Sequence, residues 1–163
     1  MLKKLYYIQF TTIFEETVLV ASKDALVELV FFNNISPKDL STAIERETTL
    51  LTEGKKELLQ YFEGKRTVFS LPLYQEGTAF QQKVWNALKK IPYGKTATYS
   101  EIAALIGHPK AFRAVGNANN KNKLPIFIPC HRVIGKGGSL TGYRYGLEMK
   151  RQLLRLEGAN ELL

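Results

Sequence analysis

The apolar pattern changes from strand-like to helix-like along the chain, and this order restricts the fold more than any other sequence feature. Residues 5–13, 17–22 and 25–32 are rich in valine, isoleucine, threonine and aromatic residues. The short polar breaks between these runs predict an antiparallel meander, closed at Asn33-Asn34. From Pro37 onward apolar residues recur at roughly helical spacing, at Leu40, Ile44, Leu50, Leu51, Leu58, Leu59 and Phe62. Strands followed by helices indicate an α+β fold.

Two domains are predicted, residues 1–77 and 78–163, with a linker at about residues 70–77, where Pro72 and Gly77 lie. Gly54 lies inside the first helical pattern and argues against one unbroken helix there. A chain of 163 residues that is 45% hydrophobic can bury a substantial core.

The second half contains clear helix signals. Thr78 and Gln81 form a capping box that opens a helix over residues 79–90. Thr98 and Glu101 form a second capping box, and that helix should run through Ile106. A third helix is predicted from Pro109 to about residue 119, and a last one over residues 147–156. The second and third helices make a helix-turn-helix candidate.

Positive charge is concentrated in the second half. Residues 1–77 carry a net charge of −2, whereas residues 78–163 carry +10. This asymmetry points to a polyanionic partner, with nucleic acid the first choice and a solvated basic surface the simpler alternative. The third helix places Lys110, Arg113, Asn117 and Asn120 among small residues that allow a close approach of its backbone: Ala111, Ala114 and Gly116.

The only cysteine, Cys130, lies in the apolar segment of residues 124–133, which Pro125 and Pro129 interrupt. A lone cysteine often acts as a small buried hydrophobe. Here His131 and Arg132 follow it directly, and two potential cations beside a thiol favour the nucleophilic thiolate. Adjacent residues of an extended segment face opposite ways, so His131 is expected to act through a water molecule or after a local turn.

Composition also limits the other classes of function. A single cysteine cannot form an internal disulfide, which favours a reducing cytoplasm. Cys130, His108 and His131 are too few for a structural zinc site, so no metal is predicted. The glycine-rich loop at residues 135–139 fits neither a Walker A nor a Rossmann pattern, so no cofactor is expected. No run is long and apolar enough to span a bilayer, and no leader sequence is expected.

These motifs together resemble the O6-alkylguanine-DNA alkyltransferases. The resemblance is specific over residues 78–158 and weaker over the first half. Its central part is the run from Pro129 to Val133. The other matching elements, in chain order, are Ile91-Pro92-Tyr93-Gly94, Tyr99, Arg113-Ala114-Val115-Gly116, Asn122, Gly142-Tyr143 and Leu156-Glu157-Gly158.

The resemblance implies a ribonuclease H-like N-terminal domain, a winged-helix-like C-terminal domain and a catalytic set. Cys130 would attack the alkyl carbon on guanine O6, or on thymine O4, and retain the alkyl group. His131 would deprotonate Cys130 through a water molecule, with Glu157 orienting the imidazole. Tyr99 would assist the leaving purine, and Asn122 would hold the active-site turn.

The same resemblance implies how the protein meets DNA. A monomer would bind the minor groove of duplex DNA, and Arg113 would fill the space left by a flipped nucleotide. The implied DNA-contacting residues are Arg113, Lys110, Ala111, Ala114, Gly116 and Arg132. The implied pocket residues are Pro125, Tyr143, Arg144 and Tyr145. Phe112, Lys123 and the Arg144-Tyr145 pair depart from patterns seen in part of the family.

Two other classes remain open from the residues alone. A helix-turn-helix regulator would bind undamaged DNA sequences and would survive loss of Cys130. A thiol hydrolase with a Cys–His relay would turn over many times.

Overall fold

The computed structural model describes residues 3–31 and 40–159, which divide into two compact units, Met1–Gln75 and Glu76–Leu163. The boundary falls within the segment expected to be a linker. The expected α+β class is confirmed, because strands dominate the first unit and helices the second. Within the described residues, no helix combines the length and apolar character needed to span a membrane.

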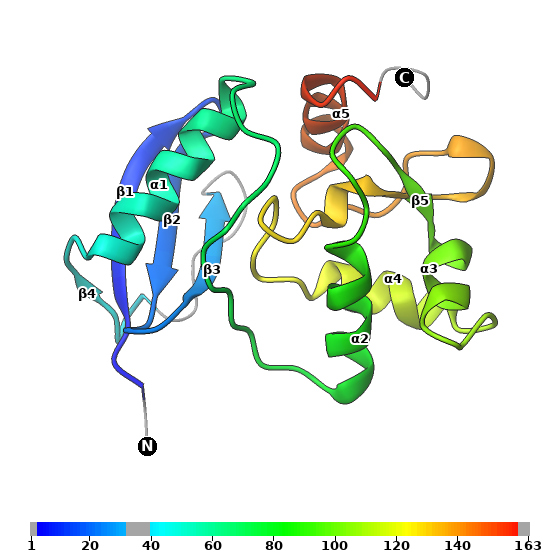
Figure 1. The fold of residues 1–163 in the computed structure, drawn as a ribbon, viewed down its shortest axis with the longest axis horizontal. Coiled ribbons are helices and arrows are strands. Elements are labelled where there is room, and N and C mark those ends of the chain that lie inside the picture. The colour runs from blue at the N-terminus through cyan, green and yellow to red at the C-terminus, as the bar shows by residue number, and fades with distance from the viewer. Residues whose placement is uncertain (1–2, 32–39, 160–163) are drawn as a thin grey trace. The chain divides into compact units, whose positions relative to one another are not determined.

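The first unit is a four-stranded sheet covered on one face by a helix (Figure 1). The predicted antiparallel meander is confirmed as β1 (Tyr6–Thr12), β2 (Glu15–Ala21) and β3 (Leu26–Phe31). The strand order is β3-β2-β1-β4, and β4 (Ile44–Glu45) pairs parallel to β1. The turn predicted at Asn33-Asn34 and the helical start at Pro37 lie outside the described residues.

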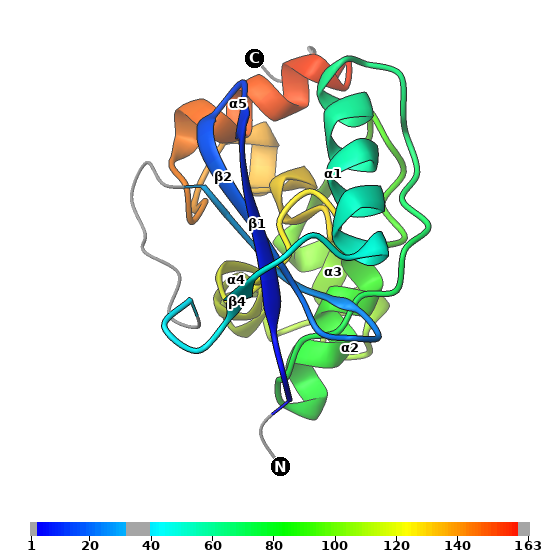
Figure 2. The same cartoon turned by 90° about the vertical axis from the view of Figure 1, so that its left-hand side faces the viewer.

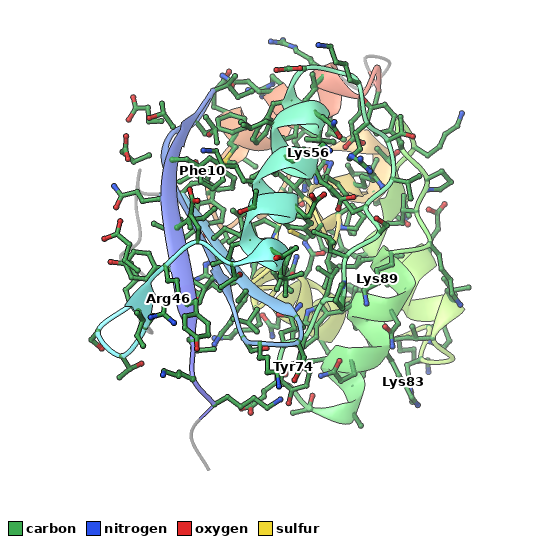
Figure 3. The ribbon with its side chains drawn as sticks, turned by 60° about the vertical axis from the view of Figure 1, so that its left-hand side comes forward. Phe10, Arg46, Lys56, Tyr74, Lys83 and Lys89 are labelled. Carbon is green, nitrogen blue, oxygen red and sulfur yellow. The ribbon has the colours of Figure 1, made fainter. Side chains whose placement is uncertain are left out.

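Helix α1 (Thr49–Phe62) lies along this sheet, on one side of the strands in Figure 2. It buries Leu51, Leu58 and Tyr61 completely. On β1, Phe10 is buried and lies on the α1 side (Figure 3), with Lys55 Nζ 5.3 Å from the centre of its ring. The sheet face and the apolar stripe of α1 therefore form one core.

Two expectations for this unit are wrong. Helix α1 runs unbroken through Gly54, because the helix lies so close to the sheet that a Cβ there would come 2.7 Å from Leu19 Cδ2. Glycine is needed for this approach and does not end the helix. Ile44 was expected to be helical, but it pairs with Tyr6 in the sheet. Tertiary pairing thus overrides the local helical spacing.

The second unit contains α2 (Ala79–Leu88), α3 (Tyr99–Leu105), α4 (Phe112–Asn120) and α5 (Leu147–Leu156). Both predicted capping boxes are present, at Thr78 and at Thr98. The predicted bounds of the last helix agree with α5. Two-residue strands β5 (Ala97–Thr98) and β6 (Val133–Ile134) pair in parallel beside α3.

The predicted helix-turn-helix is formed by α3 and α4, which lie next to each other in Figure 1 and pack against α2. The indole Nε1 of Trp85 on α2 donates to the Ala118 carbonyl of α4 at 2.9 Å. The predicted start of the third helix is wrong, because α4 begins at Phe112. Pro109 instead lies in a turn closed by the hydrogen bond from Ala111 N to His108 O, a position that proline also favours.

Candidate active site

Two asparagines hold the segment that carries Cys130. Asn122 Nδ2 donates to the Ile128 carbonyl at 2.9 Å, and Asn122 Oδ1 accepts from Leu124 N at 3.0 Å. Asn119, on α4, donates through Nδ2 to the Cys130 carbonyl at 3.2 Å. Ile126, which lies between the two backbone groups that Asn122 binds, is buried with a φ of 73°, an unfavourable conformation for a β-branched residue. The chain keeps this conformation because hydrogen bonds hold it on both sides.

Cys130, His131 and Arg132 form one turn of 3-10 helix rather than an extended run. The extended segment expected before Cys130 is wrong, because the chain already turns at Ile126 and Phe127, where Ile128 N donates to the Leu124 carbonyl at 2.9 Å. For His131, the local turn anticipated as an alternative is the one present. All three side chains are buried; Cys130 is 4% exposed and His131 is fully buried.

His131 is joined to Glu157, which caps the C-terminal end of α5. Their Nε2 and Oε2 atoms lie 2.6 Å apart. With the proton on Nε2, His131 donates to the carboxylate, and the lone pair on Nδ1 can accept another proton. Nδ1 is buried and has no hydrogen-bond partner among the described residues. The arrangement fits a base that receives its proton at Nδ1.

The electrostatics keep this pair in one protonation state. Burial raises the pKa of Glu157, but hydrogen bonds and charge from His131 and Arg132 outweigh it and hold that pKa far below its usual range. Burial is the main cause that lowers the pKa of His131, and it outweighs the opposing effect of Glu157. We therefore treat Glu157 as an anion and His131 as neutral at neutral pH.

The thiol is not activated in the way the sequence suggested. Burial raises the pKa of Cys130, against smaller opposing effects from the Asn122 hydrogen bond, the charge of Lys150 and a hydrogen bond from Tyr143. The two expected cations do not lower the pKa of Cys130, because burial favours the neutral form of His131 and Glu157 balances the charge of Arg132. Lowering of the thiol pKa by His131 and Arg132 is therefore a wrong expectation, and Lys150 supplies the cation.

Lys150 was missed by sequence reasoning. It lies on α5, its side chain is fully buried, and Nζ donates to the carbonyls of Val133 and Thr141. Both acceptors are backbone oxygens, which carry only partial charge. Burial lowers the pKa of Lys150 to about 8, while the Cys130 thiolate opposes this shift. In the sequence, Lys150 looked like an ordinary charged residue of an amphipathic helix.

Three of the predicted pocket residues, Tyr143, Arg144 and Tyr145, directly follow the segment Thr141-Gly142, which Tyr99 contacts. The Tyr99 hydroxyl donates to the Thr141 carbonyl at 3.1 Å and to the Gly142 carbonyl at 3.4 Å. Burial is the main cause that raises the pKa of Tyr99, so the hydroxyl keeps its proton at neutral pH. Tyr143 and Tyr145 are buried with ring centres 6.2 Å apart, and the Arg144 guanidinium lies 5.8 Å from the Tyr145 ring centre. Pro125 is also buried.

The predicted DNA-facing residues of the helix-turn-helix lie on one exposed stretch. Lys110 and Ala111 precede α4, and Arg113 and Ala114 are exposed on its first turn. Gly116 is half-buried against the Tyr99 ring, from which an added Cβ would lie 3.7 Å away. Phe112 is 45% exposed, so it faces solvent beside Arg113 rather than the core.

Arg132 does not fit the DNA-contacting role expected of it. Its side chain is buried, Nε and Nη2 donate to Glu157 at 2.8 and 3.1 Å, and Nη1 donates to the Ile91 carbonyl at 2.7 Å. The expectation is wrong because each of these nitrogens already has an acceptor inside the protein.

No cluster of three or more His, Cys, Asp or Glu side chains that could hold a metal ion occurs in residues 3–31 and 40–159.

The fold and site define an α+β protein whose helical unit carries one buried thiol beside a histidine–carboxylate relay. Residues 79–159 match the family description "6-O-methylguanine DNA methyltransferase, DNA binding domain". Residues 5–75 match "6-O-methylguanine DNA methyltransferase, ribonuclease-like domain". The chain belongs to the 6-O-methylguanine DNA methyltransferase family.

Individual relatives agree over nearly the whole length. The constitutive methylated-DNA–protein-cysteine methyltransferase of Bacillus subtilis is 47% identical over 157 residues, which cover 93% of this chain and 94% of that protein. The Methanosarcina acetivorans methylated-DNA–protein-cysteine methyltransferase is 44% identical, with 95% and 99% covered. The structure of Mycobacterium tuberculosis OGT in complex with DNA matches with a TM-score of 0.86 and 40% identity, over 94% of this chain and 93% of that one.

Proposed function

We propose that this protein repairs O6-alkylguanine, and O4-alkylthymine, in duplex DNA by moving the alkyl group irreversibly to Cys130. Its reaction class is that of its relatives, the transfer of a methyl group from methylated DNA to a protein cysteine. The observation that carries the residue assignment is the buried Cys130, followed by a neutral His131 whose Nε2 is bound to Glu157 and whose Nδ1 can accept a proton.

The roles follow from the chemistry of one displacement. The proton of Cys130 passes through a water molecule to His131 Nδ1, and Glu157 stabilises the imidazolium that forms. The sulfur then bonds to the alkyl carbon, the bond from that carbon to guanine O6 breaks, and its electron pair stays on the purine. Tyr99 keeps its hydroxyl proton, and once this hydroxyl releases the Thr141 carbonyl it can donate a hydrogen bond to the leaving purine.

Binding to DNA is assigned to α3 and α4. The target atom lies inside the base stack, so the nucleotide must be flipped out before the sulfur can reach it. A minor-groove approach is supported by the small residues at Ala111, Ala114 and Gly116, and Arg113 is the exposed side chain able to fill the vacated space. We propose that a monomer suffices, because Cys130, His131 and Glu157 come from one chain. The lone cysteine supports a cytoplasmic location.

The experiment that tests this function uses a DNA duplex whose O6-methylguanine carries a labelled methyl group. The label should move to the protein and resist denaturation, because a thioether is not exchanged like a disulfide. A helix-turn-helix regulator would acquire no label, and a thiol hydrolase would release labelled methanol.

Arg113→Ala should slow repair of duplex DNA by roughly tenfold or more, because flipping costs on the order of a few kcal/mol. Its reaction with free O6-alkylguanine base should stay nearly unchanged, since the free base needs no flipping. The measurement is the rate constant of transfer from each substrate. Arg155→Ala, which removes an exposed arginine from α5, is the matched control. Equal losses on both substrates would assign Arg113 a structural role.

A further inference from the structure

Arg132 is a buried cation that the reaction described above does not use. Its guanidinium forms a two-point contact with the Glu157 carboxylate and a third bond to the Ile91 carbonyl. It also lies 5.8 Å from the centre of the Tyr93 ring. A planar guanidinium held at three points has little freedom to move, so its position is a fixed part of the site.

The carboxylate of Glu157 accepts from three residues, and the side chains of two of them, His131 and Arg132, compete for it electrostatically. Oε2 accepts from both His131 Nε2 and Arg132 Nη2, while Oε1 accepts from Arg132 Nε and from Gly94 N at 3.3 Å. Gly94 has a φ of 77°, and a Cβ there would lie 2.8 Å from the Glu157 carbonyl oxygen. The turn after α2 and the end of α5 are thus joined through one carboxylate.

The sharing determines what kind of hydrogen bond His131 makes. An isolated buried carboxylate 2.6 Å from an imidazole would favour the protonated, cationic ring. An imidazolium carries protons on both nitrogens, so its Nδ1 could no longer accept one from the thiol. Because Arg132 already balances the charge of Glu157, a neutral His131 can donate to the same oxygen.

We propose that Arg132 is a positioning residue of the relay: it fixes the Glu157 carboxylate and, by balancing its charge, keeps His131 neutral and able to accept the proton of Cys130. This role rests on the proposed function of the relay.

The other charged groups around His131 agree with this role. Glu157, from the end of α5, raises the pKa of His131, whereas Arg132 and Lys150 lower it, in addition to the larger effect of burial. Lys150 comes from α5 and is held by backbone carbonyls, so it does not contact Glu157 in the way that Arg132 does. Cys130, the adjacent residue, is the proton donor in the reaction.

Nuclear magnetic resonance of histidines labelled with nitrogen-15 tests the protonation state directly. The chain has only two histidines, exposed His108 and buried His131, so the two signals can be assigned by a His108→Gln variant. In the unchanged protein His131 should be the neutral form with its proton on Nε2 at about pH 7. In Arg132→Met the His131 signal should be that of the imidazolium at the same pH.

Transfer rates measured at saturating methylated duplex give the functional result. Arg132→Met should lose roughly tenfold more rate at about pH 6 than at about pH 8.5, because a higher pH removes the extra proton from His131. Arg132→Lys restores the charge without the two-point contact and should keep the pH dependence of the unchanged protein. Arg66→Met is the matched control, since Arg66 pairs with the buried Glu57 at 2.9 Å in the other unit.

Three results would overturn the proposal. They are an imidazolium signal for His131 in the unchanged protein at pH 7, an equal loss for Arg132→Met at every pH, and a loss in Arg132→Lys as large as in Arg132→Met. The first needs no variant, so it stands even if Arg132→Met does not fold. Failure of the proposed function is seen separately, as an unchanged protein that acquires no label.

Discussion

Replacing Cys130 with alanine is expected to abolish methyl transfer while leaving DNA binding intact. Cys130 is the only cysteine in the chain, so no second thiol can take over the displacement. The change removes one buried sulfur atom and leaves the hydrogen bonds of the Cys130 backbone to Ile128 and Asn119 available. The variant should therefore fold, and it should lose methyl transfer completely rather than partially.

DNA binding by Cys130→Ala is measured by titration with methylated duplex at several salt concentrations. Affinity should fall steeply as salt rises, because residues 78–163 carry a net charge of +10 and phosphate contacts release counterions. Arg113→Ala provides the contrast, since it should bind less well yet still transfer from free base. Transfer of label to Cys130→Ala would show that another residue is the acceptor.

Replacing Lys150 with methionine is expected to slow transfer at neutral pH by roughly tenfold or more. The charge of Lys150 lowers the pKa of Cys130, so its removal raises that pKa further and reduces the thiolate. The rate should therefore reach its plateau at a higher pH in the variant. The readout is the transfer rate from free O6-benzylguanine across pH, which separates thiol chemistry from DNA binding.

Lys83→Met is the matched control, because this change removes the same charge from an exposed position on α2 (Figure 3).

The pH dependence of stability gives an independent check of the buried Lys150. The folded pKa of Lys150 is about 8 against 10.5 for the free side chain, so the unfolded state holds its proton more tightly. The unchanged protein should gain up to about 3 kcal/mol over Lys150→Met as pH rises from about 8 to 10.5. If the stability of the unchanged protein and that of Lys150→Met changed equally with pH, Lys150 would not be a buried cation.

Local signals in the sequence were enough to predict those helices and strands that depend on residues close to one another along the chain. The capping boxes at Thr78 and Thr98 act over three residues, and both helices begin where these pairs predict. The last helix, α5, follows from its apolar stripe, and the β1–β3 meander from its alternating runs. Cys130, His131 and Glu157 could be grouped only through the family resemblance, because Glu157 is far from the other two in sequence.

Other features depend on contacts between distant segments, which a single sequence does not reveal. Gly54 remains helical because α1 must approach Leu19, and Ile44 becomes a strand because β1 offers an open edge. Arg132 was expected to contact DNA through the family resemblance, but its hydrogen-bond acceptors are Ile91 and Glu157. Lys150 could not be distinguished from the exposed lysines, since only folding buries it behind Val133 and Thr141.

Irreversible transfer to Cys130 is tested most directly by counting the methyl groups transferred per protein molecule and then mapping the modified residue by mass spectrometry. An alkylated Cys130 is a thioether with no second cysteine to resolve it, so the reaction should stop at one equivalent even with excess methylated DNA. All of the label should lie on Cys130, and none should appear as methanol. Product formation that continues beyond one equivalent, or label on any other residue, would contradict irreversible transfer to Cys130.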